Sequence, residues 1–180
     1  TPKTSSAASD VYKRQTFYSI SNCQEGLSRV TLGNFLIKRV VYELQEELPD
    51  VKNFGTLSPM QGFADWVKSL ENEKISEIVQ KDNFVKVEFL KSLDLKIGDR
   101  KFIDNKDLLT KLALNYLAVQ KNDLGFPIND VCRFHLKNGA EIDDIVVNAN
   151  VSDVGFKRSF GIMVNYKYEL GKIEQNHQEY

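Results

Sequence analysis

The stretch from residue 16 to residue 48 reads TFYSISNCQEGLSRVTLGNFLIKRVVYELQEEL. Its beginning, residues 16–21, alternates in polarity and is rich in strand-forming residues, which predicts a strand. Its end carries apolar residues at steps of three and four, which predicts a helix that ends at Pro49-Asp50. A short segment that contains Gly26 joins the two. The stretch therefore predicts a strand, a turn and a helix in succession.

The rest of the chain adds strands and helices in mixed order. Short apolar runs predict strands over 54–57 and 161–168, and the first of these stops at Ser58-Pro59. Apolar spacing predicts helices that begin near Phe63 and after a capping Asn105. The runs 131–137 and 140–147 flank Asn138-Gly139, which suits a type I′ turn and predicts a β-hairpin. The order predicts an α/β (α+β) fold with a mixed, twisted sheet flanked by helices.

Composition and charge limit the class of protein. The chain has 180 residues, 42% of them hydrophobic, which suits one domain with a substantial core. A net charge of -1 argues against nucleic acid as the main partner, and no apolar run approaches the roughly 20 residues that span a bilayer. The two cysteines, Cys23 and Cys132, are expected to be buried, reduced thiols. With only two histidines besides, no metal-ligand spacing is present.

The first fifteen residues differ in character from the rest of the chain. They lack apolar periodicity and contain the small, polar run SSAAS. We expect residues 1–15 to be a disordered tail or a non-native segment, and residues 16–180 to form the folded domain.

A candidate anion-binding turn precedes the first predicted helix. Helix N-terminal amides and the helix dipole attract phosphate, and Gly33 would let a pyrophosphate approach the backbone. The candidate binding residues are Ser28, Arg29, Val30, Thr31, Leu32, Gly33 and Asn34. Plain packing of a strand, a turn and a helix is the alternative reading, because a lone glycine is a weak signal.

Five blocks of the sequence resemble the malonyl-CoA decarboxylase family, in the same order. They are YSIS with QEGL and LGNFLIKRVV (residues 18–41), LSPMQGF (57–63), RFHL with NGA (133–140), GIMVNYKY (161–168) and IEQNH (173–177). The resemblance runs from about residue 17 to residue 180, with little match between 70 and 105.

The resemblance implies the acyl-CoA N-acyltransferase (GNAT-like) fold, without the helical N-terminal domain of that family and with an incomplete C-terminus. It implies a lyase that converts malonyl-CoA into acetyl-CoA and CO2 in fatty acid metabolism. CoA would be part of the substrate, with no cofactor and no metal. The expected partners are malonyl-CoA and further copies of the chain, as in the family's tetramers, with no nucleic acid and no membrane. The expected location is intracellular: the cytoplasm or the mitochondrial matrix, with the peroxisome left open.

The same resemblance points to three catalytic residues. His135 matches the family's proton donor, and Ser58 matches its other catalytic residue, for which we favour hydrogen bonding to substrate over an acyl-enzyme. Tyr168 matches an active-site tyrosine. Read without the family, Ser58 is a turn or helix-cap residue, Tyr168 a packed strand residue and His135 a solvated strand residue on a cationic face with Arg133 and Lys137.

The sequence departs from the family in places that bear on function. Arg29 stands where the family has a second glycine, Gln61 where it has proline, and Asn129-Asp130 where it has Asp-Pro. Two other readings therefore stay open: a CoA-dependent acyltransferase of the same fold, and an inactive CoA-binding fragment.

Overall fold

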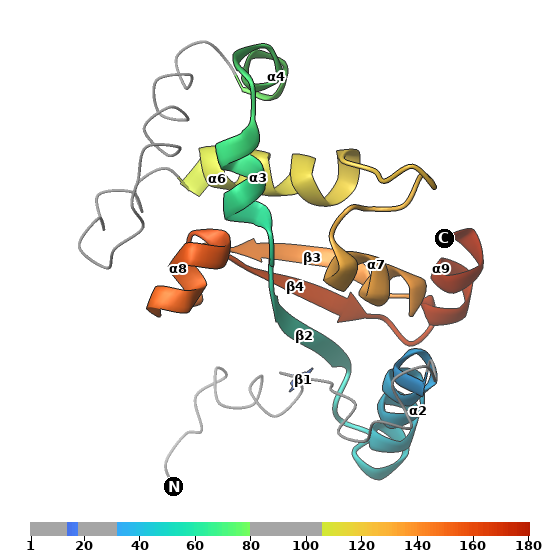
Figure 1. The fold of residues 1–180 in the computed structure, drawn as a ribbon. Coiled ribbons are helices and arrows are strands. Elements are labelled where there is room, and N and C mark those ends of the chain that lie inside the picture. Colours follow the sequence, from blue (N-terminus) through green and yellow to red (C-terminus); the bar gives the residue numbers. More distant parts are fainter. Residues whose placement is uncertain (1–13, 18–31, 80–105) are drawn as a thin grey trace, which may run out of the picture. The chain divides into compact units, whose positions relative to one another are not determined.

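The computed structural model describes residues 14–17, 32–79 and 106–180 (Figure 1). Its helices and strands, in chain order, are β1 (Arg14–Phe17), α2 (Leu32–Glu47), β2 (Asn53–Pro59), α3 (Phe63–Ser69), α4 (Asn72–Ile78), α6 (Lys106–Leu114), the π-helical turn η4 (Asn115–Val119), α7 (Asp130–Lys137), β3 (Glu141–Val146), α8 (Asp153–Ser159), β4 (Met163–Tyr168) and α9 (Ile173–Glu179). The chain forms two compact units. Unit 1 comprises residues up to Ser58, Phe134–Asp143 and Asn165–Tyr180, and unit 2 comprises Pro59–Arg133 and Asp144–Val164.

The described strands form one mixed sheet in the order β1-β2-β4-β3. Strands β1 and β2 are parallel, with Arg14 opposite Asn53 and Phe17 opposite Thr56. Strands β2, β4 and β3 run antiparallel. The sheet and its helices confirm the predicted mixed α/β class. The part of the predicted first strand beyond Phe17 lies outside the described residues.

Helix α2 of unit 1 ends where the sequence predicts. Its inward side chains Ile37 and Val41 are buried, and Lys38 pairs with Glu174 of α9 at 3.2 Å. The predicted strand over 54–57 also forms, as the centre of β2. Local hydrophobic spacing was therefore a sufficient guide for these two elements.

The core of unit 2 is built around aromatic rings. The Phe63 ring of α3 lies 5.8 Å from that of Phe160, edge to face, and 5.6 Å from that of Tyr116. The Trp66 ring is 5.2 Å from that of Tyr116. Such tilted pairs add to the free energy of burial. Both helices that the sequence predicts in this unit, α3 and α6, are confirmed.

The predicted hairpin around Asn138-Gly139 is wrong. Its first arm is helix α7, and only its second arm is a strand, β3. The sequence carries a complete helix pattern here, with a capping Asn129, an acidic Asp130, a basic Lys137 and a glycine beyond the end. Gly139 has a φ of 80° and ends α7. Its amide donates to the backbone carbonyl of Leu136, and the amide of Ala140 donates to the backbone carbonyl of His135. This is a Schellman motif and not a type I′ turn.

Among the described residues, three short helices have no counterpart in the sequence prediction: α4, α8 and α9. Each buries one hydrophobic side chain (Ile75, Phe156 or Ile173), too few for apolar periodicity to stand out, whereas α3 of the same length buries three. Helix α8 does begin with a capping serine, Ser152, whose hydroxyl accepts from the amide of Gly155 at 3.1 Å. That capping residue was the available signal.

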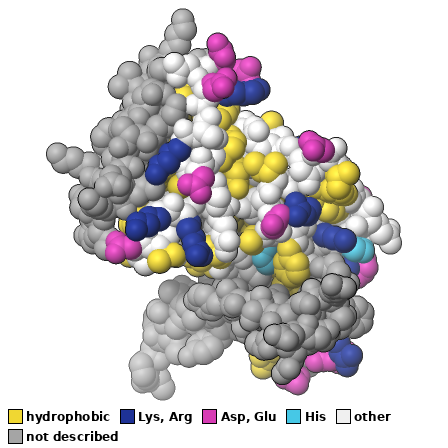
Figure 2. Space-filling model, viewed as in Figure 1, with side chains coloured by type: hydrophobic (Ala, Val, Ile, Leu, Met, Phe, Trp, Pro, Cys, Tyr) yellow, Lys and Arg dark blue, Asp and Glu magenta, His cyan; other side chains and the backbone are white. Residues whose placement is uncertain are grey.

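The surface of the described residues carries charges of both signs. On the face drawn in Figure 2, basic and acidic side chains are interspersed, and hydrophobic side chains lie among them. None of the described helices is long and apolar enough to cross a bilayer.

Candidate active site

Ser58 lies near the end of β2, on its buried face. Burial alternates along this strand, so that Phe54, Thr56 and Ser58 point the same way. Ser58 retains 7% of its exposure and Thr56 retains 2%. The serine is therefore a core residue and not a turn residue.

His135 enters unit 1 from the last turn of α7. Its side chain is only 5% exposed. The prediction from the alternating pattern, that His135 is a solvated strand residue, is therefore wrong. Two residues along a helix point to nearly opposite sides, which separates His135 from Arg133 and Lys137. Arg133 instead donates to the carbonyl of Pro127 and pairs with Asp130, and Lys137 is exposed. The expected cationic face around His135 does not form.

Strand β4 supplies two tyrosines to the same site. Val164, Tyr166 and Tyr168 alternate with less buried residues, and both tyrosines are completely buried. The two rings therefore share one face of the strand next to β2. The sequence prediction named Tyr168 and missed Tyr166, although the two-residue spacing on a strand was the signal.

A chain of hydrogen bonds joins these side chains within unit 1. Ser58 Oγ lies 2.9 Å from His135 Nε2, and His135 Nδ1 lies 2.8 Å from the Tyr168 hydroxyl. Ser58 Oγ also donates to Thr56 Oγ1 at 3.4 Å. The imidazole stacks on Tyr166, with ring centroids 4.3 Å apart and planes 21° from parallel. All three predicted catalytic residues are thus brought together.

Burial keeps this site neutral. It lowers the pKa of His135 from 6.5 to about 4 and raises the pKa of Tyr168, because the low-dielectric surroundings disfavour the charged form of each. At neutral pH the imidazole therefore carries one proton, and the phenol keeps its own.

The hydrogen-bond partners assign that single proton to Nε2. The Tyr168 hydroxyl has one partner among the described residues, the Nδ1 of His135. If it accepted a proton from Nδ1, its own buried proton would have no acceptor among the described residues, at a cost of about 1–3 kcal/mol. Donation by Tyr168 avoids this cost and leaves the proton on Nε2, which donates to Ser58. The imidazole is then a proton donor toward Ser58 and does not activate it as a nucleophile.

Most of the predicted substrate-binding turn lies outside the described residues. This applies to Ser28, Arg29, Val30 and Thr31, whereas Leu32, Gly33 and Asn34 form the first turn of α2. Cys132 is a buried, reduced thiol, as expected, and Cys23 lies outside the described residues. Within the described ranges, no three His, Cys, Asp or Glu residues gather closely enough to hold a metal.

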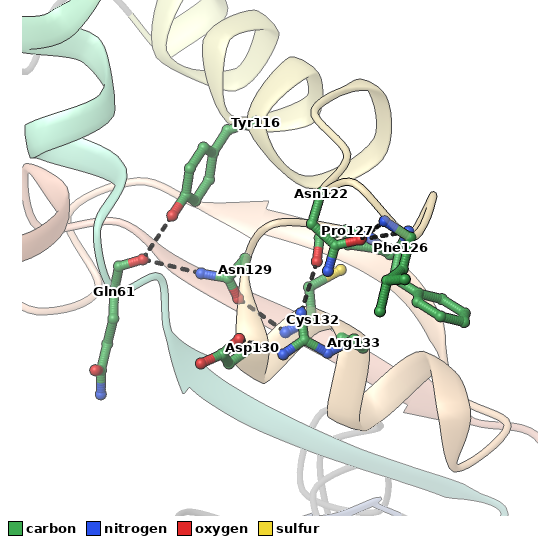
Figure 3. A network of polar contacts seen from close by, with 10 residues as sticks. Gln61, Tyr116, Asn122, Phe126, Pro127, Asn129, Asp130, Cys132 and Arg133 are labelled. Atoms are coloured by element: carbon green, nitrogen blue, oxygen red, sulfur yellow. Dashed lines mark hydrogen bonds and ion pairs between the residues drawn. The ribbon is translucent and has the colours of Figure 1, made fainter.

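A second polar network, in unit 2, holds the start of α7 (Figure 3). The Asn129 side chain is 3% exposed and makes two hydrogen bonds. Its Oδ1 accepts from the amide of Cys132 at 2.8 Å and caps the helix, and its Nδ2 donates to the carbonyl of Gln61 at 2.9 Å. The hydroxyl of Tyr116 donates to the same carbonyl at 2.9 Å. Asn129 thus links the helix that carries His135 to the segment that comes after Ser58 in the chain.

We expect Asn129→Ala to lower the free energy of unfolding by about 1–2 kcal/mol, because the helix cap is lost. Asn129→Asp is the matched variant, since a carboxylate still caps α7 but cannot donate to the Gln61 carbonyl. Its loss should be smaller than that of the alanine variant. Urea unfolding of the three proteins measures both differences, and equal losses for alanine and aspartate would contradict the capping role.

Fold and site together define an α/β domain with a buried Ser-His-Tyr hydrogen-bonded chain, in which a neutral imidazole presents a proton to a serine. The sequence pattern of the family described as "Malonyl-CoA decarboxylase C-terminal domain" matches residues 2–180. The chain belongs to this family.

Individual relatives agree with this assignment. The chain is 37% identical to the mitochondrial malonyl-CoA decarboxylase of Rattus norvegicus and 35% identical to that of Anser anser anser, over 91% of its own length in each case. Among solved structures, it is similar to malonyl-CoA decarboxylase from Rhodopseudomonas palustris (TM-score 0.79, 40% identity, 92% of this chain and 38% of that chain). It is also similar to that from Cupriavidus metallidurans (TM-score 0.76, 36% identity, 93% and 45%). The chain spans 36–37% of the length of the two curated relatives.

Proposed function

We propose that this chain carries the catalytic site for decarboxylation of malonyl-CoA to acetyl-CoA and CO2. The single observation that supports it best is the buried chain Ser58–His135–Tyr168, at the positions that the family motifs assign to catalysis. The relatives that match the chain are named malonyl-CoA decarboxylases. A hydrogen-bonded serine and a proton-donating imidazole are the groups that this reaction requires.

The chemistry needs a donor for a developing oxyanion and a source of one proton. When the bond between the α-carbon and the carboxylate breaks, CO2 leaves and its electron pair forms an enolate on the thioester. The Ser58 hydroxyl, whose one proton makes a long 3.4 Å contact with Thr56 Oγ1 in the free protein, turns to the substrate and is the donor that stabilises the malonyl group and the enolate oxygen. A proton taken from solvent must then reach the α-carbon, and His135 supplies it from the Nε2 side. The thioester carbonyl itself takes up the electrons, so the step needs no cofactor.

Substrate binding prepares His135 for this role. The imidazole is neutral in the free protein because burial lowers its pKa to about 4. An anionic malonyl carboxylate close by favours the charged imidazolium and raises that pKa toward neutrality. The Tyr168 oxygen can accept from Nδ1 as well as donate to it, so it can stabilise the protonated ring too. His135 is therefore protonated, and can act as an acid, when the substrate is bound.

The remaining parts of the proposal depend on the family resemblance. Residues 28–34 bind the CoA pyrophosphate at the start of α2, where Arg29 can pair with phosphate. The sheet is of the GNAT-like type. The protein acts as a homo-oligomer inside the cell, and the mitochondrial names of the vertebrate relatives favour the matrix over the cytoplasm.

The proposed function is tested by measuring CO2 release from carboxyl-labelled malonyl-CoA without an acceptor amine. Stoichiometric formation of labelled CO2 and acetyl-CoA is the expected result. Acyl transfer that occurs only when an amine is added would identify an acyltransferase instead. CoA binding by calorimetry without any turnover would identify a binding module and overturn the proposal.

We expect Ser58→Ala to lower kcat by about 100- to 1000-fold, the usual cost of losing one oxyanion donor, with a smaller rise in KM. Ser159→Ala is the control, because Ser159 is also buried and, within the described residues, its hydroxyl donates to the carbonyls of Gly155 and Ile162 in unit 2. That variant should lose stability and keep kcat. Steady-state kinetics of both variants measure kcat and KM. An unchanged kcat for Ser58→Ala would show that this serine has no role in the mechanism.

A further inference from the structure

Tyr166 makes a contact that the proposed mechanism does not use. Its ring lies nearly parallel to the imidazole of His135, at 4.3 Å between centroids, and is completely buried. It lies two residues before Tyr168, which bonds the edge of the same imidazole. One strand therefore contacts both the face and the edge of His135.

The hydrogen bonds alone hold the plane of the imidazole only at the ring edge. Rotation about the Cβ–Cγ bond moves Nδ1 and Nε2 out of the ring plane in opposite directions, and the two hydrogen bonds tolerate small rotations of this kind. This last torsion of a histidine side chain has broad minima, so intrinsic preference does not stop the rotation either. A flat aromatic surface against the ring face does stop it. The Phe134 ring offers only an edge, at 80° to the imidazole and 5.2 Å away.

We infer that Tyr166 is a positioning residue for His135, whose ring holds the imidazole plane so that Nε2–H stays directed at Ser58. The inference rests on the proposed function for its kinetic consequence only, because the orientation of the ring can be observed without substrate. Reactions of this kind lose rate when a reacting group is misplaced by about 1 Å, by up to about 100-fold.

Two substitutions separate the aromatic face from simple filling of space. Tyr166→Phe keeps the ring and removes only the hydroxyl. Tyr166→Leu fills most of the space with an apolar group that has no flat face. Phe63→Leu makes a comparable aromatic-to-leucine change in the core of unit 2 and serves as the control for lost stability. If Tyr166→Leu does not fold, Tyr166→Met takes its place, because methionine adapts to the same cavity.

The readout is nitrogen NMR of the histidine side chains, which reports directly on the tautomer. The chain has only two histidines, and His177→Gln assigns the second signal. Wild type, Tyr166→Phe and Phe63→Leu should show His135 as one tautomer with the proton on Nε2. Tyr166→Leu should show averaged nitrogen shifts and a kcat lowered about 10- to 100-fold at unchanged KM.

A Tyr166→Leu protein with the wild-type tautomer and kcat would overturn the inference. So would averaged shifts in Phe63→Leu, because general loss of stability would then explain both. If wild type releases no CO2, the proposed function fails, and the NMR comparison still tests the role of Tyr166 by itself.

Discussion

The His135→Ala protein is expected to retain CoA binding and to lose decarboxylation by about 100- to 10,000-fold, the range for removal of a positioned general acid. The substitution removes the group that connects Ser58 to Tyr168, since both hydrogen bonds of the chain end on its imidazole. Both kcat and kcat/KM should fall together, because the proton is needed only after the substrate is bound. Release of labelled CO2 measures the first effect, and calorimetry with CoA measures the second.

The second histidine supplies the control for this experiment. His177 lies on α9, exposed, and its Nδ1 contacts the carbonyl of Lys137 at the end of α7. His177→Ala should leave kcat within a factor of about two, because His177 is exposed and is not part of the Ser58–His135–Tyr168 chain. Turnover of His135→Ala at the wild-type rate would exclude His135 as the proton donor.

The largest effect on stability is expected for Gly139→Ala. The glycine has a φ of 80°, which costs an alanine about 1–2 kcal/mol. A Cβ there would also lie 2.1 Å from the carbonyl oxygen of Ile173, a backbone atom at the start of α9. Such an overlap adds about 1–3 kcal/mol, because the backbone of one element must move. We therefore expect a loss of about 2–5 kcal/mol in urea unfolding.

Two other glycines separate these causes. Gly125 has nearly the same φ, 81°, but nothing lies within 4 Å of an added Cβ, so Gly125→Ala measures the backbone cost alone. Gly171 has open space around it and no positive φ, and its alanine variant should be close to wild type. Equal losses for Gly139→Ala and Gly125→Ala would show that the contact with Ile173 relaxes at no cost.

The same glycine explains the main error of the sequence prediction. An Asn-Gly pair suits a hairpin turn and also the end of a helix, because both need a residue with positive φ. The run before it alternates weakly, yet Asn129, Cys132 and His135 are buried at a spacing of three, which is helical. Weighing capping residues above alternation would have identified α7.

The candidate catalytic residues were predictable and their arrangement was not. Ser58, His135 and Tyr168 were predicted from short sequence motifs. Such motifs identify residues but do not show how they are arranged in space. The imidazole of His135 is neutral because it is buried. The apparent alternation of residues 132–137 instead predicted that this side chain faces solvent. Tyr166 was missed because its role depends on the plane of a ring that comes from an element about thirty residues earlier.

The alternation of side chains along β4 has a consequence for the chemistry of the site. A slip of this strand by one residue would turn Tyr166 and Tyr168 away from His135 and bring Asn165 and Lys167 toward it. A cation beside the imidazole would oppose its protonation, and an amide could bond either ring nitrogen, so the tautomer would no longer be fixed. The buried face of β4, formed by Val164, Tyr166 and Tyr168, specifies the register, and the pairing of the less buried Asn165 with Asp143 at 2.8 Å fits it. The register of one strand thus determines which side chains surround the imidazole.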